Sequence, residues 1–307
     1  RFRWVVDTAH KGFRRILRLM GPATLGLAAL QVNLIINSAI ASHLQEGAIS
    51  WLNYAFRMVY LPIGVIGVAV ATVSSVELSR HAAREDMESF KESISAALRI
   101  VAYFSIPASA GLVLLAKPII ALIFDYGRFA DSPVATSNTA VALSLYASTL
   151  FFYCGIKVVA PAFYALDKAR LPMIASMTAV SVNLIWSLST YQTLGFKALA
   201  LGAALAALVN FAVLATSLNR QLGGLRGHGL RLALVKIVAL TVPMALAAWS
   251  LNLMLEHLWG SASFTARCAG IVLPILVAAV VWLWGGRLLN LREAQDVWAA
   301  LKQRWKQ

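Results

Sequence analysis

The sequence predicts an all-α integral membrane protein with about eight transmembrane helices, and three observations support this class. Hydrophobic residues make up 60% of the 307 residues, and the mean hydropathy is strongly positive. That composition excludes an ordinary soluble domain. Apolar runs of the length that a membrane-spanning helix needs, ~20 residues, recur along the chain. Lys and Arg gather at the ends of these runs, as in the loops of membrane proteins.

The apolar runs define the expected helices in order. They cover about residues 16–42, 49–76, 94–124, 135–164, 172–191, 196–218, 232–255 and 264–284. Prolines lie inside several of them, and a proline removes a helical hydrogen bond, so we expect bends there. The fifth run begins with Pro172, a favourable residue in a first helical turn. The sixth is rich in Ala and Gly, which favours close helix packing.

The last two runs are apolar nearly all round, and only Lys236 and Arg267 intrude near their ends. We expect these two helices to face lipid or a lipid-like ligand, or simply to anchor the edge of the bundle. The chain ends, residues 1–15 and 290–307, are basic and carry aromatic residues. Both ends are expected to lie along the membrane surface. Most Lys and Arg fall in these ends and in alternate loops, so the positive-inside rule places both ends in the cytoplasm.

The second run carries an arginine, Arg57, at depth in the membrane. A charge there costs roughly 2.5–3.5 kcal/mol on insertion scales. Residues three and four apart share a helix face, and this spacing places Ser50, Asn53, Tyr54 and Tyr60 with the arginine. We interpret the helix as the lining of a wet, cationic cavity. The alternative is a structural arginine paired with a carboxylate of a neighbouring helix.

The fourth run repeats this pattern around Lys157. Tyr153, Thr149 and Tyr146 share its helix face, and Pro161 follows one turn later. This lysine lies nearer the end of its run, so snorkelling to the headgroups is an equal alternative to cavity lining.

Amides and hydroxyls recur on single faces of two further runs. Asn33 and Asn37 are one turn apart in the first run. Ser176, Asn183 and Ser187 share a face of the fifth. Such residues either form hydrogen bonds between helices or line a cavity.

The sequence indicates neither an enzyme nor a cofactor. Cys154 and Cys268 lie in apolar runs, and the five histidines form no pair with metal-ligand spacing. Glycine patterns that cradle phosphates are missing. The net charge is +14, but the basic residues form no patch with base-stacking aromatics, so we expect no nucleic-acid partner.

Several stretches, in chain order, resemble one known family. They are RLMGPATLGLAALQVNLIINSAIAS, SWLNYAFRMVYLPIGVIGVAVATV, LIFDYGRF and KVVAPAFYALDKARLP. The chain is similar here to the MurJ/MviN lipid II flippases of bacterial peptidoglycan synthesis, which belong to the multidrug/oligosaccharidyl-lipid/polysaccharide exporter superfamily. The resemblance implies the second lobe of a two-lobed exporter fold plus two extra C-terminal helices.

The resemblance also implies a domain division. Residues 1–15 would form a cytoplasmic surface segment, 16–220 the six-helix C-terminal lobe, 221–289 the two additional helices and 290–307 a cytoplasmic tail. The N-terminal lobe of the same protein is then missing and is an expected partner, as are membrane lipids. Cell-wall synthases are further expected partners, and the location is the bacterial cytoplasmic (inner) membrane.

The implied cargo is lipid II, the undecaprenyl-diphosphate-linked disaccharide-pentapeptide, which the family moves from the inner to the outer leaflet. The family's essential arginine corresponds to Arg57 and its functional serine to Ser50. The other substrate-binding candidates are Asn53, Tyr54, Asn37, Lys157 and Tyr153. No metal is expected, because only Asn183 matches the sodium site described in some members, and the match is weak.

Three other functions remain open. A related exporter could carry another undecaprenyl-linked sugar, because diphosphate recognition would look alike. A drug exporter would more often show a carboxylate well inside a span, and this chain has none. A non-transporting scaffold of cell-wall synthesis would need loops that bind partners, and the loops here are short.

Overall fold

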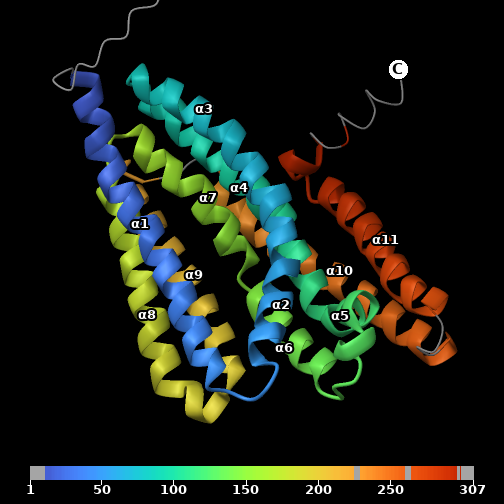
Figure 1. Ribbon diagram of the computed structural model, residues 1–307. Helices are drawn as coiled ribbons and strands as arrows, with labels where there is room; N and C mark the ends of the chain where they lie inside the picture. The colour runs from blue at the N-terminus through green and yellow to red at the C-terminus, as the bar shows by residue number, and fades with distance from the viewer. Residues whose placement is uncertain (1–10, 225–228, 260–263, 296–297, 299–307) are drawn as a thin grey trace, which may run out of the picture.

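The computed structural model describes residues 11–224, 229–259, 264–295 and 298, and within these residues every regular element is helical (Figure 1). The α-helices are α1 Lys11–Ser42, α2 Ala48–Pro62, α3 Ala69–Ala83, α4 Met87–Leu114, α5 Ala116–Phe124, α6 Ala135–Ala147, α7 Leu150–Ala165, α8 Arg170–Leu194, α9 Phe196–Gln221, α10 Leu230–Trp259 and α11 Phe264–Leu288. A π-helix, η1 Ile63–Val68, joins α2 to α3, and a 3₁₀ turn, η2 Gly127–Phe129, follows α5.

The predicted fold class is confirmed. Among the described residues, six helices are long and apolar enough to cross a membrane, and the bent pair α6–α7 makes a seventh if counted as one span. The first expected span is helical throughout, as part of α1. The described part of this helix begins at Lys11, so residues 11–15 are helical and continuous with it. The rest of the two expected surface segments, except 290–295 and 298, lies outside the described residues.

The bends in these helices follow local hydrogen bonding as well as proline. After Pro62 the helix widens into η1, because proline cannot donate the next helical hydrogen bond. The α6–α7 pair bends by 42° at Ser148–Thr149, and α7 continues through Pro161 as one helix. There the hydroxyls of Ser148 and Thr149 donate to the carbonyls of Leu145 (2.7 Å) and Tyr146 (3.1 Å). These side chains compete with the helical backbone, which favours a break.

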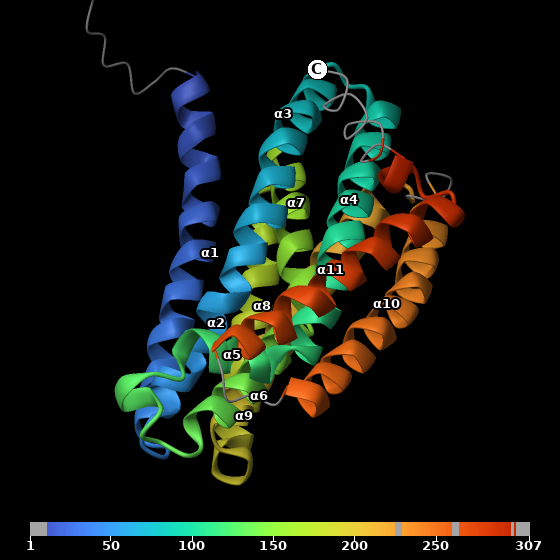
Figure 2. The same ribbon diagram turned by 90° about the vertical axis from the view of Figure 1, so that its right-hand side faces the viewer.

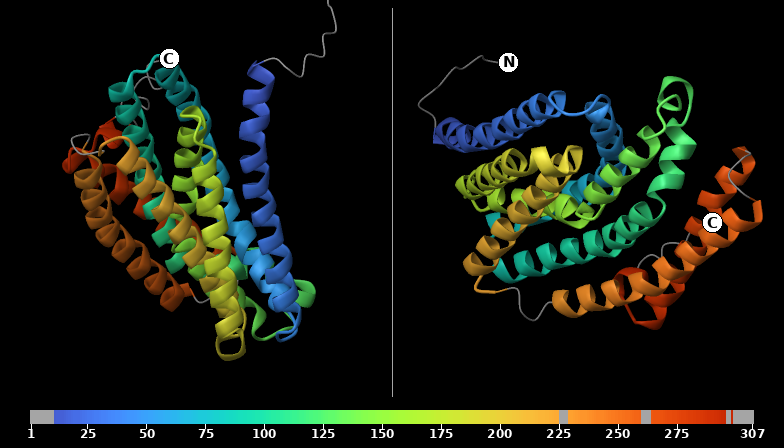
Figure 3. Two further views of the ribbon diagram at one scale, coloured as in Figure 1. Left: turned by 90° about the vertical axis from the view of Figure 1, so that its left-hand side faces the viewer. Right: turned by 90° about the horizontal axis from the view of Figure 1, so that it is seen from below.

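The helices pack as one bundle with α1 and the α10–α11 pair on opposite sides (Figures 2 and 3). Helices α8 and α9 form an antiparallel hairpin that turns at Gly195, whose φ of +57° suits glycine. Helix α1 packs on α8, α2 on α6, and α4 on α3 and α7. The larger apolar core lies among α1 to α9, with Ile40 and Ala41 contributed by the end of α1.

The α10–α11 pair has a second, smaller core, built around Tyr103 of α4 and Trp282 of α11. Two ion pairs tie this pair to the rest of the bundle. Arg99 of α4 and Glu293 after α11 are 2.8 Å apart and nearly buried. At the other end of α11, the Arg267 guanidinium lies 3.6 Å from the Asp125 carboxylate. Helix α11 is therefore tied to the six-helix part by an ion pair near each of its ends, and α10 packs on α4.

Candidate substrate pocket

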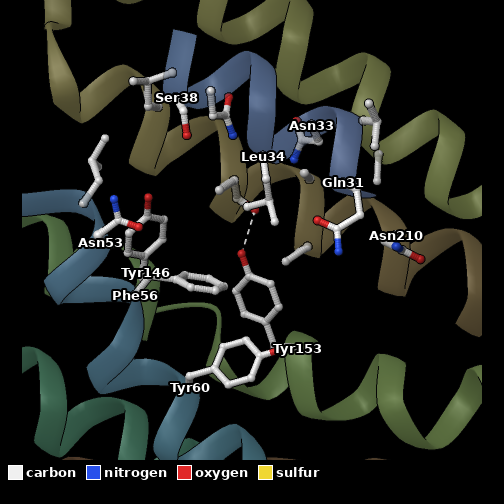
Figure 4. Close-up of a pocket in the computed structure, with 18 of the residues that line it drawn as sticks. Gln31, Asn33, Leu34, Ser38, Asn53, Phe56, Tyr60, Tyr146, Tyr153 and Asn210 are labelled. Carbon is white, nitrogen blue, oxygen red and sulfur yellow. Dashed lines mark hydrogen bonds between the residues drawn. The ribbon is translucent and has the colours of Figure 1, made fainter. Parts of the chain in front are cut away.

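A cavity of about 540 Å³ lies between α1, α2, α6, α7, α8 and α9, and it is open on one side, where lining residues such as Leu34, Asn53 and Lys157 are exposed (Figure 4). In Figure 4, Phe56, Tyr60 and Tyr153 group on one wall and α1 forms the opposite wall. The polar residues that line it are Gln31, Asn33, Asn37, Ser38, Asn53, Tyr60, Tyr146, Tyr153, Lys157 and Asn210. Its volume is within the range of about 300–1,000 Å³ that small-ligand pockets occupy.

One wall of the pocket is fixed by an amide cluster. The side-chain nitrogen of Asn183 donates to the side-chain oxygens of Asn33 and of Asn37, the latter at 3.1 Å. The Asn183 oxygen accepts from Ser187 at 3.3 Å, and both residues are fully buried. Gly202 of α9 leaves room for this cluster, because a Cβ there would lie 2.7 Å from the Ser187 hydroxyl. The sequence left two roles open for Asn33 and Asn37, hydrogen bonds between helices and lining of a cavity. The two residues do both.

An aromatic group forms the facing wall. Phe56 packs edge-on against Tyr146, with ring centroids 5.4 Å apart, and against Tyr153 at 6.2 Å. The Tyr153 hydroxyl donates to the Ala203 carbonyl at 3.2 Å, which holds its ring in place (Figure 4). Tyr60 lies one helical turn after Phe56, and their ring centroids are 5.5 Å apart. The pocket thus combines flat apolar rings with amides and hydroxyls.

The structure places the predicted site residues in two groups. Four of them line the pocket: Asn37, Asn53, Tyr153 and Lys157. Arg57 and Ser50 do not line it. They lie exposed on the adjoining face of α2, together with Asn53 and Tyr60. Within the described part of the chain, Arg57 has neither an ion pair nor a hydrogen bond, so the carboxylate partner of the alternative interpretation is not found there.

Tyr54 departs from the arrangement expected from helix spacing. Its ring stacks on Phe124 at 4.7 Å between centroids and meets Phe129 edge-on at 5.7 Å. It is therefore turned toward the end of α5 and η2 rather than toward the pocket. Helix spacing gives a residue's side of the helix, but the neighbouring aromatic rings decide where the phenol packs.

Asn210 is a pocket residue that sequence reasoning missed. It is 6% exposed, and its side-chain oxygen has no hydrogen-bond partner among the described residues. A usable signal existed, because this amide interrupts the otherwise apolar run of α9. Polar side chains inside a membrane span are costly and mark functional positions by default.

The described residues hold no group of three or more His, Cys, Asp or Glu side chains that could hold a metal ion. Asn183, the weak sodium candidate, uses its amide nitrogen and oxygen within the cluster of Asn33, Asn37 and Ser187. Its role in sodium binding stays a prediction.

Comparison with solved structures defines the class of fold, a multi-helix membrane bundle that two solved proteins share. A structure described as lipid II flippase MurJ in an inward closed conformation matches with a TM-score of 0.70 and 23% identity. The match covers 94% of this chain and 57% of that one. An outward-facing multidrug resistance MATE family transporter of the MOP superfamily matches with a TM-score of 0.59 and 14% identity, covering 92% and 66% of the two chains.

Sequence comparison then gives the family. The family model described as lipid II flippase MurJ matches residues 1–270. A probable lipid II flippase MurJ of Buchnera aphidicola is 31% identical over 282 residues, covering 92% of this chain and 54% of that protein. Its counterpart in Vibrio cholerae is 31% identical over 297 residues, covering 93% and 55%. The chain belongs to the MurJ family, and it spans about half the length of these relatives.

Proposed function

We propose that this chain is the C-terminal part of a flippase that moves lipid II from the inner to the outer leaflet of the bacterial cytoplasmic membrane. The family assignment supports a transporter rather than an enzyme. The chain covers about half of its relatives, which supports a second lobe that packs against a missing first lobe. Both ends of this chain would be cytoplasmic, in line with the distribution of Lys and Arg.

The observation that carries the proposal is the exposed face of α2 around Arg57. Among the described residues this guanidinium has no ion-pair partner, and Ser50 and Asn53 are exposed beside it. A diphosphate cannot cross hydrocarbon unaided, and a guanidinium offers it two parallel charge-assisted hydrogen bonds while staying protonated. In a cavity of reduced dielectric this attraction is stronger than in bulk water.

Transport would follow from alternating access. The exposed face of α2 would meet the other lobe, and rocking of the two lobes would open the space between them to one side and then the other. The undecaprenyl tail would stay in lipid beside α10 and α11, whose outer faces carry exposed apolar side chains such as Val235, Val242 and Leu276.

The test replaces Arg57 in the full-length protein that carries this chain, expressed as the only flippase of a depleted cell. Arg57→Ala should abolish growth and lipid II export at normal protein levels. Arg57→Lys should restore part of both, because the charge remains but the fork is lost. Arg170→Ala, an exposed arginine at the start of α8, is the matched control and should grow normally.

Full complementation by Arg57→Ala would remove Arg57 from the mechanism. Growth of cells that make the protein but export no lipid II would favour a scaffold of cell-wall synthesis. A competition assay with other undecaprenyl-linked sugars and with amphipathic drugs separates the remaining exporters, since only lipid II should compete at low concentration.

A further inference from the structure

One corner of the bundle contacts both the helix that carries Arg57 and the last helix. It consists of the end of α5 and the 3₁₀ turn η2, residues 124–129, and we call it the α5–η2 corner. In Figure 1 it lies between α2 and the start of α11, at the end of the bundle where both of these helices begin. The corner is therefore placed to connect two helices that are far apart in the sequence.

One side of the corner holds an aromatic ring of α2. Tyr54 stacks on Phe124 with 4.7 Å between ring centroids, and it meets Phe129 edge-on at 5.7 Å. The two phenylalanine rings also contact each other, with their centroids 6.1 Å apart. Aromatic pairs in such arrangements stabilise a contact beyond the area that they bury. The three rings therefore hold one side of α2 against the corner.

The other side of the corner holds α11. The Asp125 carboxylate lies 3.6 Å from the Arg267 guanidinium, and it accepts a hydrogen bond from the Thr136 hydroxyl at 3.3 Å. Both charged side chains are 30% exposed, so water screens this ion pair only in part. Among the described residues, α11 packs most extensively on α10 and next on α5. The corner is therefore the main link between α11 and the six-helix part at this end.

The backbone of the corner separates the two contacts. Asp125 has φ −75° and ψ 57°, and the Tyr126 amide donates to the Phe124 carbonyl at 2.7 Å, which is the geometry of an inverse γ-turn. Gly127 then has a φ of +54°, a conformation that glycine adopts without a steric cost. These turns bring Phe129 back beside Phe124, while the Asp125 carboxylate pairs with α11.

The contact of α2 lies next to its arginine. Tyr54 precedes Arg57 by three residues, close to one helical turn. Because a helix is stiff over one turn, a ring that is held at Tyr54 fixes the direction in which Arg57 points. A shift of α11 acts on Asp125, and Asp125 is the chain neighbour of Phe124, on which the Tyr54 ring stacks. The position of the Arg57 side chain is therefore linked to that of α11.

We propose that Tyr54 is a positioning residue, and that the α5–η2 corner couples the start of α2 to α11 so that the two helices move as one unit. This gives Tyr54 a role other than substrate contact, and it gives the pair of Asp125 and Arg267 a role beyond anchoring α11. The consequence for transport rests on the proposed function, whereas the coupling itself is a property of the fold.

The first experiment measures hydrogen exchange of the full-length protein in nanodiscs. Tyr54→Leu removes the ring stack, and Arg267→Gln removes the ion pair on the opposite side of the corner. Tyr54→Phe keeps the ring and is the conservative variant. The matched controls are Tyr164→Leu, an exposed tyrosine of α7, and Glu256→Gln, an exposed charge near the end of α10.

Tyr54→Leu and Arg267→Gln should each speed exchange in the first turns of both α2 and α11, although each changes only one of these helices. The expected rise is about two- to tenfold for the lost ring stack. It is about two- to fivefold for the lost, partly exposed ion pair. Tyr54→Phe and the two controls should exchange like the unmodified protein. Faster exchange only in the helix that carries the substitution would overturn the coupling.

The second experiment measures lipid II translocation in liposomes at equal incorporation. Tyr54→Leu and Arg267→Gln should each slow it, and the double variant should be no slower than the slower single variant, because both changes break the same link. Tyr54→Phe should translocate at the unmodified rate, because the ring and not the hydroxyl makes the contact. Glu256→Gln should also leave the rate unchanged.

Two results of this assay would overturn the proposal. Single losses that multiply in the double variant would show that the two contacts act independently. Unmodified rates in both single variants would show that transport does not use the corner. If the unmodified protein translocated no lipid II, the proposed function would fail, and hydrogen exchange would still decide whether α2 and α11 are coupled.

Discussion

The ion pair between Arg99 and Glu293 offers the sharpest test of how the last two helices are held. The two charged groups are 2.8 Å apart, and their side chains are 12% and 6% exposed. Removing one partner of a buried pair leaves a buried charge, which costs roughly 3–5 kcal/mol. Replacing both partners by leucine is expected to be nearly neutral, because no charge is then left unpaired.

Hydrogen exchange of the full-length protein in nanodiscs reads out this effect locally. The amides of Leu291 and Gln295 bond to the carbonyls of Gly286 and Leu291 beside the ion pair. Arg99→Leu alone and Glu293→Leu alone should each speed their exchange by about a hundredfold or more. The double variant should recover most of the protection, and Arg292→Leu, an exposed neighbour, should change little.

Additive losses in the double variant would refute the reasoning, because they would show that the two side chains act independently. Unchanged exchange in both single variants would show that the apolar core around Tyr103 and Trp282 holds the helices without the ion pair.

Three further predictions concern other contacts. Gly202→Ala should lower stability by about 1–3 kcal/mol, because the added Cβ overpacks the Asn183–Ser187 contact. Gly111→Ala is the control, because its Cβ meets open space and should leave stability unchanged. Thermal unfolding of both variants in the same detergent measures the difference, and equal midpoints would contradict the packing argument. Hydrogen bonds from Ser89 lower the pKa of Asp86, whose side chain caps the start of α4. The cap should therefore stabilise α4 fully above the usual pKa of 3.8, and this stability should be lost as the pH falls through the lowered pKa. Hydrogen exchange at the start of α4 should speed up only in that acidic range, and faster exchange near neutral pH would contradict the prediction. Lys157→Met should reduce lipid II export while Lys117→Met does not, since only Lys157 lines the pocket; equal export by both would favour snorkelling for Lys157.

Much of the fold could be predicted from composition because the bilayer imposes strong constraints. A span must be apolar and about 20 residues long, so the runs themselves marked the helices. The breaks were harder to predict. The bend at Ser148–Thr149 depends on hydroxyls that bond to the backbone, and similar residues elsewhere leave a helix straight, as Ser189 does in α8.

The site was predictable to the extent that it depends on helix faces. Spacing made Asn37, Asn53, Tyr153 and Lys157 candidates for a cavity, with other roles open for Asn37 and Lys157, and the four line one pocket. Spacing could not separate that pocket from the outer face that carries Arg57, because the division depends on which helices pack beside α2. Nor could it pair Arg99 with Glu293, which lie 194 residues apart.

Direct measurement of translocation tests the central claim. The full-length protein is reconstituted in liposomes with fluorescent lipid II, and a membrane-impermeant quencher reports the headgroups that reach the outer leaflet. We expect rapid translocation by the unmodified protein and the bare-liposome rate for Arg57→Ala at equal incorporation. Translocation by Arg57→Ala at the unmodified rate would contradict it.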